Sequence, residues 1–291
     1  MLAANYKLDV MMYIMYNINT GGKEGVNLMS AVLGAIIGDI AGSKYEFNNI
    51  FTTDFKMLDD DCWFTDDTIL TLAIAKACKH NLDYADTLRE VCRANDYIHN
   101  KSFGPMFVHF VETGIPNNSF GNGSAIRVSY LGEYFQNLEQ VLQEAEKSAI
   151  ASHTHVDAIA GAKCIAGATH LAKTGANKQE ILDFAKTIYE INLDAIHPSP
   201  KFEVSCSGSV PIAIKTVMTT NNFEDCIKTV ISYGGDSDST AAMAGSIAGA
   251  LYPAEVIKYE KQALAYLDDY LTNIYIDITK EHKKILNSTL K

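Results

Sequence analysis

Two short acidic segments carry the side chains of this sequence that are best suited to chemistry. Residues 64–68 read Phe-Thr-Asp-Asp-Thr, and residues 234–240 read Gly-Gly-Asp-Ser-Asp-Ser-Thr. Each segment places two carboxylates and neighbouring hydroxyls directly before an apolar run with the composition of a buried helix. Neither segment has a lysine or arginine within four residues that could neutralise its charge.

These carboxylates have two interpretations. Asp, Ser and Thr are preferred at helix N-termini, where they accept hydrogen bonds and complement the helix dipole, so capping would account for one aspartate per segment. A second carboxylate leading into an uncharged buried helix needs a cation or several hydrogen bonds. Hard divalent cations such as Mg²⁺ prefer oxygen ligands, and four carboxylates suffice for two ions if the two helix starts meet. The four are Asp66, Asp67, Asp236 and Asp238.

Helices are the elements expected to position both segments. Residues 67–77 are rich in strong helix formers and apolar on nearly every side, which predicts a buried helix. Residues 238–252 predict a helix whose small side chains would let another helix approach closely. Further helical patterns cover 83–99, 137–151, 178–192, 222–232 and 254–290, and the best strand candidate, 202–205, is short. The expected fold class is therefore all-α.

Length, composition and charge limit the class of protein. The 291 residues are 47% hydrophobic, which is normal for a globular chain and excludes a disordered or fibrous one. With 24 basic and 35 acidic side chains, the net charge is −11. This charge argues against a nucleic-acid backbone or an anionic membrane surface as the main partner. No apolar stretch approaches the roughly 20 residues that a membrane span requires.

The cysteines and the N-terminal residues are not expected to take part in chemistry. The six cysteines form no C-x-x-C pair, so they predict reduced, mostly buried thiols and a cytoplasmic protein. Residues 1–28 end near a glycine-rich stretch and contain no clear signal-peptide cleavage site. We expect residues 1–28 to be a non-catalytic extension and residues 29–291 to form one domain.

Five short motifs follow one another along the chain. They are 38–46 (Gly-Asp-Ile-Ala-Gly-Ser-Lys-Tyr-Glu), 65–68 (Thr-Asp-Asp-Thr), 121–127 (Gly-Asn-Gly-Ser-Ala-Ile-Arg), 154–155 (Thr-His) and 234–238 (Gly-Gly-Asp-Ser-Asp). Their order and spacing resemble those of the ADP-ribosylglycohydrolases, the family of dinitrogenase reductase-activating glycohydrolase and the ADP-ribosylhydrolases. The resemblance spans about residues 31–253, and it implies a compact, orthogonal all-α domain with two Mg²⁺ or Mn²⁺ ions in a cleft.

The resemblance also assigns metal ligands and a catalytic carboxylate. The implied ligands are Thr65, Asp66, Asp67, Asp236, Asp238 and Ser239. Ser239 stands where the family usually has threonine, so the hydroxyl is kept and the methyl that stiffens the rotamer is lost. Glu46 matches an acidic residue that closes over the site in some members. The candidates for the carboxylate that orients or deprotonates the attacking water are Glu46, Asp66 and Asp238.

Substrate contacts are expected in two loops and at one histidine. The glycine loop, residues 119–124, could offer backbone N–H groups to a diphosphate, although the residues alone fit an ordinary turn before a helix. By resemblance this loop touches the phosphates, with Phe120 near an aromatic part of the ligand. Residues 206–210 match a segment that lines the cleft. The candidate contacts are Phe120, Gly121, Asn122, Gly123, Ser124, His155, Ser207 and Gly208.

Other residues near these motifs have structural interpretations. His153 lacks further ligands at zinc spacing. Arg127 is expected to tie the glycine loop to buried carbonyls or to an acid. Asp39 is expected to cap a helix or to contact a metal ligand. Residues 59–61 are expected to form a solvated loop. Trp63 has two interpretations of equal weight, packing in the core and a contact at the rim of the cleft.

The reaction implied by the resemblance is hydrolysis at C1″ of the distal ribose in ADP-ribose. The substrate would be an ADP-ribosylated protein or another ADP-ribosyl conjugate, and the product would be free ADP-ribose. Nucleic acid is expected as a partner only if it is itself an ADP-ribosylated substrate. Two alternatives stay open: a two-metal phosphohydrolase, since clustered aspartates also suit phosphoryl transfer, and a non-catalytic ADP-ribose-binding module. The leaving group stays open among arginine, serine, a base and a small metabolite.

Overall fold

All the regular secondary structure in the described part of the chain is helical. The computed structural model describes residues 29–289, so the predicted extension at 1–28 lies outside the described residues. The α-helices are α2 Ser30–Ser43, α3 Asp66–His80, α4 Tyr84–Arg93, α5 Tyr97–Asn100, α6 Pro105–Thr113, α7 Ser129–Tyr134, α8 Leu138–Ile150, α9 Val156–Lys173, α10 Lys178–Lys186, α11 Cys206–Thr219, α12 Phe223–Ile231, α13 Ser237–Leu251, α14 Pro253–Val256, α15 Glu260–Leu264 and α16 Asp269–Thr289. Short 3₁₀ turns are η1 Ala94–Asp96, η2 Asn122–Ser124, η3 Leu193–Ala195 and η4 Ile257–Tyr259.

The all-α prediction is confirmed, and the strand prediction for residues 202–205 is wrong. That segment makes only an isolated bridge, between Ser205 and Gly121. All six cysteines are free, and five of them are buried, as the sequence predicts. Within residues 29–289, no helix combines the length and the apolar character that crossing a bilayer requires.

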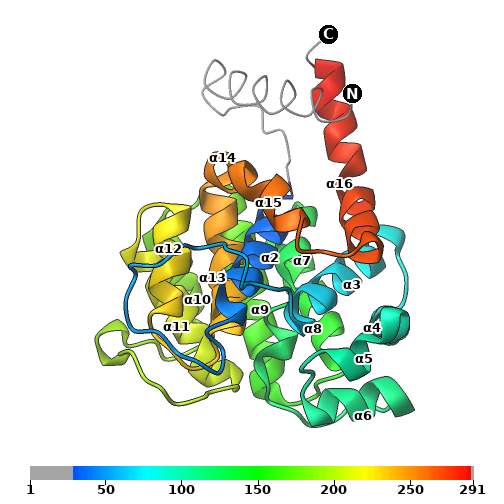
Figure 1. Ribbon diagram of the computed structural model, residues 1–291, viewed down its shortest axis with the longest axis horizontal. Helices are drawn as coiled ribbons and strands as arrows, with labels where there is room; N and C mark the ends of the chain where they lie inside the picture. Colours follow the sequence, from blue (N-terminus) through cyan, green and yellow to red (C-terminus); the bar gives the residue numbers. More distant parts are fainter. Residues whose placement is uncertain (1–28, 290–291) are drawn as a thin grey trace.

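Helices α2 and α13 form the centre of the molecule and lie side by side (Figure 1). All 14 residues of α2 are buried. A Cβ atom added to Gly34 would lie 2.1 Å from the carbonyl oxygen of Gly245, and one added to Gly42 would lie 2.5 Å from Cα of Asp238. Only glycine allows this approach of two backbones. The close packing predicted for residues 238–252 is therefore confirmed, and it brings the end of α2 beside the start of α13.

Other helices surround this pair, and some differ in length from the prediction. Helices α3 and α7 pack on α2, while α9, α11 and α12 pack on α13. The predicted helix at 254–290 is divided into α14, η4, α15 and α16, and α16 begins where the side chain of Asp268 accepts from Leu271 N at 2.9 Å. The predicted helix at 83–99 is interrupted where Asn95 and Asp96 take left-handed φ values of 50° and 56°.

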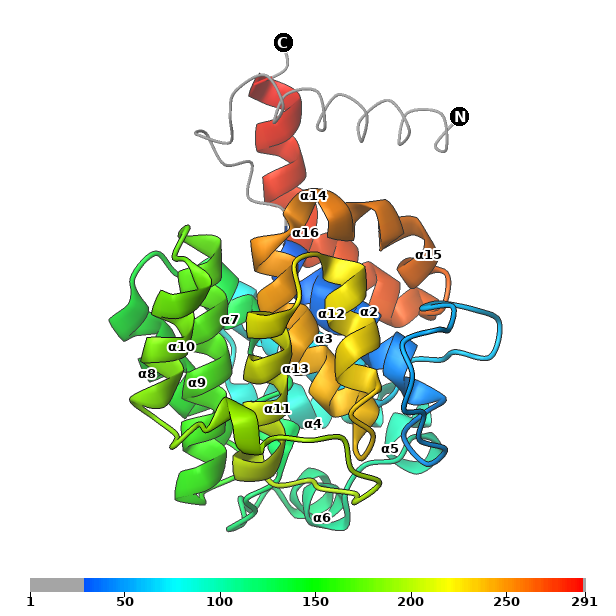
Figure 2. The same ribbon diagram turned by 90° about the vertical axis from the view of Figure 1, so that its left-hand side faces the viewer.

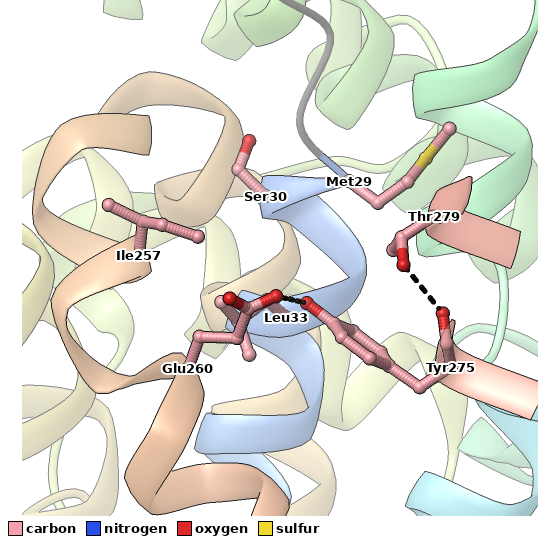
Figure 3. A pocket seen from close by; sticks show the side chains of 7 residues that line it. All are labelled: Met29, Ser30, Leu33, Ile257, Glu260, Tyr275 and Thr279. Atoms are coloured by element: carbon pink, nitrogen blue, oxygen red, sulfur yellow. Dashed lines mark hydrogen bonds between the residues drawn. The ribbon is translucent and has the colours of Figure 1, made fainter. Parts of the chain in front are cut away.

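Buried carboxylates also hold the N-terminal end of α2 in place. Glu133 on α7 accepts hydrogen bonds from the backbone N–H groups of Ser30 and Ala31 at 2.9 and 3.0 Å. Beside this end, Tyr275 on α16 donates to Glu260 on α15 at 2.8 Å (Figure 3). The cavity between these helices and α2 has a volume of about 10 Å³, which is room for about one water molecule. This end of α2 is therefore closed.

Candidate active site

A cavity of about 440 Å³ opens at the other end of the α2–α13 pair, a size typical of small-molecule sites. Helix α6 and the connection from α10 to α11, which both contribute to its wall, lie at the same end of the molecule (Figure 2). Among the residues that the sequence singles out, the lining includes Glu46, Phe120, Gly121, Asn122, Gly123, Asp66, Asp67, Asp236, Asp238 and Ser239. No lysine or arginine belongs to the lining within residues 29–289.

Capping explains only part of the first acidic segment. Thr65 is the N-cap of α3, and its hydroxyl oxygen accepts from Asp67 N at 3.2 Å. Asp39 on α2 completes the cap, because its carboxylate accepts from the N–H groups of Thr65 and Thr68 at 3.0 and 3.2 Å. Asp39 is thus a cap supplied by another helix, as the sequence predicts among its alternatives. The carboxylates of Asp66 and Asp67 take no part in this cap.

The second segment begins with a turn that only glycine adopts easily. Gly234 and Gly235 have φ values of +75° and +73°. The amide side chain of Asn49 binds Gly235 in both directions, donating to its carbonyl at 2.9 Å and accepting from its N–H at 3.0 Å. This pairing ties the connection that carries Glu46 to the turn before Asp236. Asp236 itself is the N-cap of α13 but makes no side-chain capping bond.

The carboxylates gather into two groups that could each hold a metal ion. The ligand atoms of Asp39, Asp67 and Asp238 lie within 4.8 Å of one another, and so do those of Glu46, Asp236 and Asp238. Asp238 belongs to both groups. Two buried oxygens, Oδ2 of Asp67 and Oδ1 of Asp238, have no hydrogen-bond partner within the described part of the chain. Hard oxygen donors that lack a partner fit a divalent cation such as Mg²⁺ or Mn²⁺.

Electrostatics supports the same interpretation. Burial, followed by the charges of Asp236 and Asp66, raises the pKa of Glu46 to about 8. Burial, followed by the charge of Asp39, raises the pKa of Asp66 to about 7, and burial with neighbouring carboxylates raises the pKa values of Asp67 and Asp238 well above the ordinary value. These carboxylates therefore repel one another. A bound cation favours their ionised forms.

The match to known families agrees with this arrangement of side chains. The chain matches the family model described as ADP-ribosylglycohydrolase over residues 27–284. It belongs to the ADP-ribosylglycohydrolase family. It is 27% identical over 259 residues to the ADP-ribosylarginine hydrolase Tri1 of Pseudomonas putida (strain GB-1), covering 76% of this chain and 69% of that one. It is 25% identical over 269 residues to the ADP-ribosyl-[dinitrogen reductase] glycohydrolase of Rhodospirillum rubrum, covering 82% and 90%.

A solved structure supports the fold of this member of the ADP-ribosylglycohydrolase family. The structure, titled ADP-ribosylglycohydrolase-related protein complex, superposes with a TM-score of 0.67 at 19% sequence identity. The superposition covers 87% of this chain and 96% of that chain.

The glycine loop of this family member is joined directly to the carboxylates. The side-chain amide of Asn122 donates to Oδ2 of Asp236 at 2.6 Å and to Oγ of Ser209 at 3.2 Å. Two of the loop's backbone N–H groups are already donated within the protein, from Gly121 to Ser119 Oγ at 3.1 Å and from Asn122 to the carbonyl of residue 204 at 2.7 Å. The N–H groups of Gly121 and Asn122 are therefore not free to bind a ligand in this arrangement of the loop.

Several predicted substrate contacts stand outside the cavity wall. Ser124, His155, Ser207 and Gly208 are not among the lining residues, and neither is the predicted metal ligand Thr65. Instead they stabilise helix starts and loops: His155 caps α9 by accepting from Asp157 N at 3.1 Å, and Ser207 N donates to Asp157 at 3.0 Å.

Phe120 lies in the cavity wall, whereas Ser124 is buried in the core. The ring of Phe120 is 52% exposed and meets the ring of His155 edge-on, with centroids 5.8 Å apart. The hydroxyl of Ser124 donates to the carbonyl of Ala158 at 2.9 Å. Trp63 is half-exposed, which excludes the core-packing interpretation.

The structure adds wall residues that the sequence analysis does not name as contacts. Phe47 and Phe202 line the mouth and stack with centroids 5.5 Å apart, although they are far apart in sequence. The start of α6 also lines the cavity, and its Gly-Pro pair at 104–105 is a helix-start signal that sequence reasoning could have used. His153 lines the cavity as well.

Proposed function

We propose that this protein hydrolyses the bond at C1″ of the distal ribose in an ADP-ribosylated conjugate and releases ADP-ribose. The observation that carries the proposal is the meeting of two carboxylate groups, with unpartnered buried oxygens, at a cavity of about 440 Å³. Membership of the ADP-ribosylglycohydrolase family supports a glycosidic rather than a phosphoryl substrate.

We propose that the site holds two divalent cations, Mg²⁺ or Mn²⁺. The group of Asp39, Asp67 and Asp238 would hold one, and the group of Glu46, Asp236 and Asp238 the other. We keep Thr65, Asp66 and Ser239 as proposed additional ligands. When bound, such ions supply positive charge that stabilises developing negative charge on oxygen and orients hydroxyl groups of the sugar.

The chain's own carboxylates would provide the acid–base chemistry. The attacking water must lose a proton, and Glu46, Asp66 and Asp238 all line the cavity. Asp66 belongs to neither of the two cation groups, so one of its oxygens would bind a cation while the other accepts that proton. Burial, followed by the charge of Asp39, raises its pKa to about 7 in the cation-free chain, and bound cations would lower this pKa and keep the base ionised near neutral pH. The negative charge around the ribose would also stabilise an oxocarbenium-like transition state.

We propose that the preferred linkage is to arginine. Two relatives are named ADP-ribosylarginine hydrolases, although their identities to this chain are only 27% and 23%. The charged side chains in the described cavity wall are all acidic, which favours a cationic guanidinium on the leaving side over an anionic group.

An assay of released products tests the proposal. Protein ADP-ribosylated on arginine, and a second substrate modified on serine, are incubated with the full chain and Mg²⁺, Mn²⁺ or a chelator. Chromatography should show free ADP-ribose, formed faster from arginine, with a cation requirement and with no activity in Asp66→Asn. Released AMP or phosphate would instead indicate a phosphohydrolase. Tight ADP-ribose binding without turnover of any linkage would indicate a binding module.

We further propose that residues 29–291 form the catalytic domain and that residues 1–28 play no part in catalysis. A chain that begins at residue 29 should then keep kcat/KM within about twofold of the full chain. A larger loss with unchanged thermal stability would assign a catalytic role to residues 1–28.

A further inference from the structure

The two carboxylate groups are built on different kinds of segment. Asp39, Asp67 and Asp238, which form the first group, lie on the helices α2, α3 and α13. In the second group only Asp238 lies within a helix. Glu46 lies in the connection from α2 to α3, and Asp236 lies in the turn that leads into α13. Packed helices therefore hold the ligands of the first group, whereas the second group depends on whatever joins two connections.

The carboxylate of Glu46 is not held by hydrogen bonds of its own. Among residues 29–289 it accepts none. Asp236 differs, because its Oδ2 accepts from the side-chain amide of Asn122 at 2.6 Å. The place of the Glu46 carboxylate in the second group therefore depends on the backbone that carries it.

The side-chain amide of Asn49 secures this backbone on both sides of Cα of Glu46. Nδ2 of Asn49 donates to the carbonyl of Tyr45 at 2.8 Å and to the carbonyl of Glu46 at 3.2 Å. The same nitrogen donates to the carbonyl of Gly235 at 2.9 Å, and Oδ1 accepts from Gly235 N at 3.0 Å. Three carbonyls thus share the two hydrogens of one amide. One side chain thereby joins the backbone of Glu46 to the residue directly before Asp236.

Aromatic packing on either side of Asn49 supports the same junction. The ring of Phe47 stacks on the ring of Phe202 with an interplanar angle of 24°. The ring of Phe51 lies against the turn before α13, where a Cβ atom added to Gly234 would be 2.7 Å from Cε1 of Phe51. The segment around Asn49 is therefore packed against the chain that leads into α11 and into α13.

We propose that Asn49 is a positioning residue that sets the affinity of the second carboxylate group for a divalent cation. Its amide fixes Glu46 relative to Asp236, so that both carboxylates face one ion together with Asp238. The inference rests on the proposed function, because it requires the second of the two proposed cations. Residues that orient metal ligands without touching the ion commonly change metal affinity about tenfold to a hundredfold when they are replaced.

Titration of the full chain with Mn²⁺, followed by calorimetry, tests the inference. The wild-type chain should bind two ions. Asn49→Ala should weaken binding at one site about tenfold to a hundredfold and leave the other within about threefold, because the helices of the first group are unchanged. Unchanged affinity at both sites in the folded variant would overturn the inference.

Electron paramagnetic resonance gives a second readout that a loss of stability alone would not produce. Two neighbouring Mn²⁺ ions couple magnetically, whereas a single bound ion gives the hyperfine spectrum of an isolated centre. At two equivalents of Mn²⁺ the wild-type chain should show the coupled spectrum, and Asn49→Ala should show mainly the isolated one. A coupled spectrum of equal intensity in the variant would contradict the positioning role.

A milder variant and a matched control complete the experiment. Asn49→Ser keeps a hydroxyl that can bond to only one of the two segments, so it should lose affinity at the same site by about tenfold. If Asn49→Ala does not fold, Asn49→Ser decides, and wild-type affinity in it would overturn the inference. Asn222→Ala is the control, because Asn222 is also half-buried and accepts from Asp225 N at 2.8 Å at the start of α12. It should lower thermal stability and leave both Mn²⁺ affinities unchanged, and a selective loss there would count against Asn49.

The outcomes separate this inference from the proposed function. If the wild-type chain binds two ions and releases ADP-ribose, and Asn49→Ala binds both ions equally well, the inference alone fails. If one site is selectively weakened in Asn49→Ala but no ADP-ribosylated substrate is hydrolysed, the inference holds and the hydrolase proposal fails. If the wild-type chain binds fewer than two ions, the inference and the two-cation proposal are both overturned.

Discussion

The two ends of helix α2 both lie against buried carboxylates, but the surroundings of those carboxylates differ. At the N-terminal end, Glu133 accepts hydrogen bonds from Ser30 N, Ser30 Oγ, Ala31 N and Val32 N, at 2.9, 3.1, 3.0 and 3.4 Å. At the C-terminal end, Oδ2 of Asp67 and Oδ1 of Asp238 have no hydrogen-bond partner among the residues described.

This difference separates a structural carboxylate from one that needs a ligand. The carboxylates at both ends are buried, so both carry the cost of desolvating a charge. Backbone N–H groups offset part of that cost for Glu133, and the end of the helix is closed. No donor of the described chain offsets it for the two oxygens of Asp67 and Asp238, and a cavity opens beside them. The proposed cation sites therefore rest on buried carboxylate oxygens that lack a hydrogen-bond donor within residues 29–289.

The largest expected effect is on activity at the open end. Asp238→Asn should lower kcat/KM by about a thousandfold, because it removes a ligand shared by both carboxylate groups. Its cation-free stability should stay equal or rise, because one repelling buried charge is lost. Glu133→Gln should instead destabilise the fold by about 2–4 kcal/mol and keep kcat within about threefold. Steady-state kinetics and urea denaturation of both variants would measure these effects. The comparison would be contradicted if Glu133→Gln lost activity and Asp238→Asn lost stability instead.

Alanine substitutions at Gly34 and Gly42 should show the same difference between the two ends of α2. The added methyl of Gly42→Ala would overlap Asp238 at 2.5 Å, and that of Gly34→Ala would overlap Gly245 at 2.1 Å. Both should cost about 1–3 kcal/mol of stability. Only Gly42→Ala displaces the carboxylate centre, so its kcat/KM should fall about tenfold to a hundredfold further. Equal kinetics in the two folded variants would mean that the backbone contact does not set the site.

Cation-free stability should fall as pH rises. The pKa values of Asp66 and Glu46 are raised in the folded chain to about 7 and about 8, above the ordinary values of 3.8 and 4.5. The folded state therefore holds protons that the unfolded state releases, and stability present at pH 4 is lost as pH rises through 7 to 8. Mn²⁺ at a hundred times its Kd should add about 2.7 kcal/mol at pH 8.

Urea denaturation between pH 5 and pH 8, with and without Mn²⁺, would measure the slope of the free energy of unfolding against pH. Burial also raises the pKa of Glu133 to about 7, so part of the slope should persist in Mn²⁺ and disappear in Glu133→Gln. A cation-free chain that is equally stable across this range would contradict the repulsion inferred at the open end.

The smallest expected effect concerns the hydroxyl beside Asp238. Ser239→Thr keeps the oxygen and adds one methyl to a side chain that is 6% exposed. The change should alter kcat/KM by no more than about threefold, since threonine is the residue that the family pattern has there. Steady-state kinetics would measure it. A hundredfold loss in the folded variant would place the Ser239 hydroxyl in a different role from the proposed ligand.

Sequence patterns predict the buried helices well because their signals are local. The predicted helices at 67–77 and 238–252 correspond to α3 Asp66–His80 and α13 Ser237–Leu251, which are apolar on nearly every side and start at polar caps. The predicted helix at 254–290 is less accurate, because its apolar spacing continues through the 3₁₀ turn η4 and through the cap of Asp268 that begins α16. Periodicity identifies helical composition but not every point where a side chain ends the helix.

In the site, too, features set by neighbouring residues could be predicted, and contacts between residues far apart in the sequence could not. The Asp-Asp and Asp-Ser-Asp spacings place their own carboxylates at helix starts, so these acids could be predicted from the residues alone. Asp39 contacts Thr65 across 26 positions, and Asn49 contacts Gly235 across 186, and neither contact leaves a periodic signal. His155 follows the family's motif order, yet it caps α9 while His153 faces the cavity. Motif order identifies segments and not the side chain that faces a ligand.

The glycine contacts of α2 have a consequence for how this protein tolerates change. Gly34, Gly38 and Gly42 follow one another at four-residue spacing, and a Cβ atom at each would meet the backbone of α13 within 2.5 Å. In a library that varies every position of α2 under selection for turnover, these three positions should be as invariant as Asp238, although none of them carries a functional group. Distance from the reacting atoms would then be a poor guide to which positions can be varied.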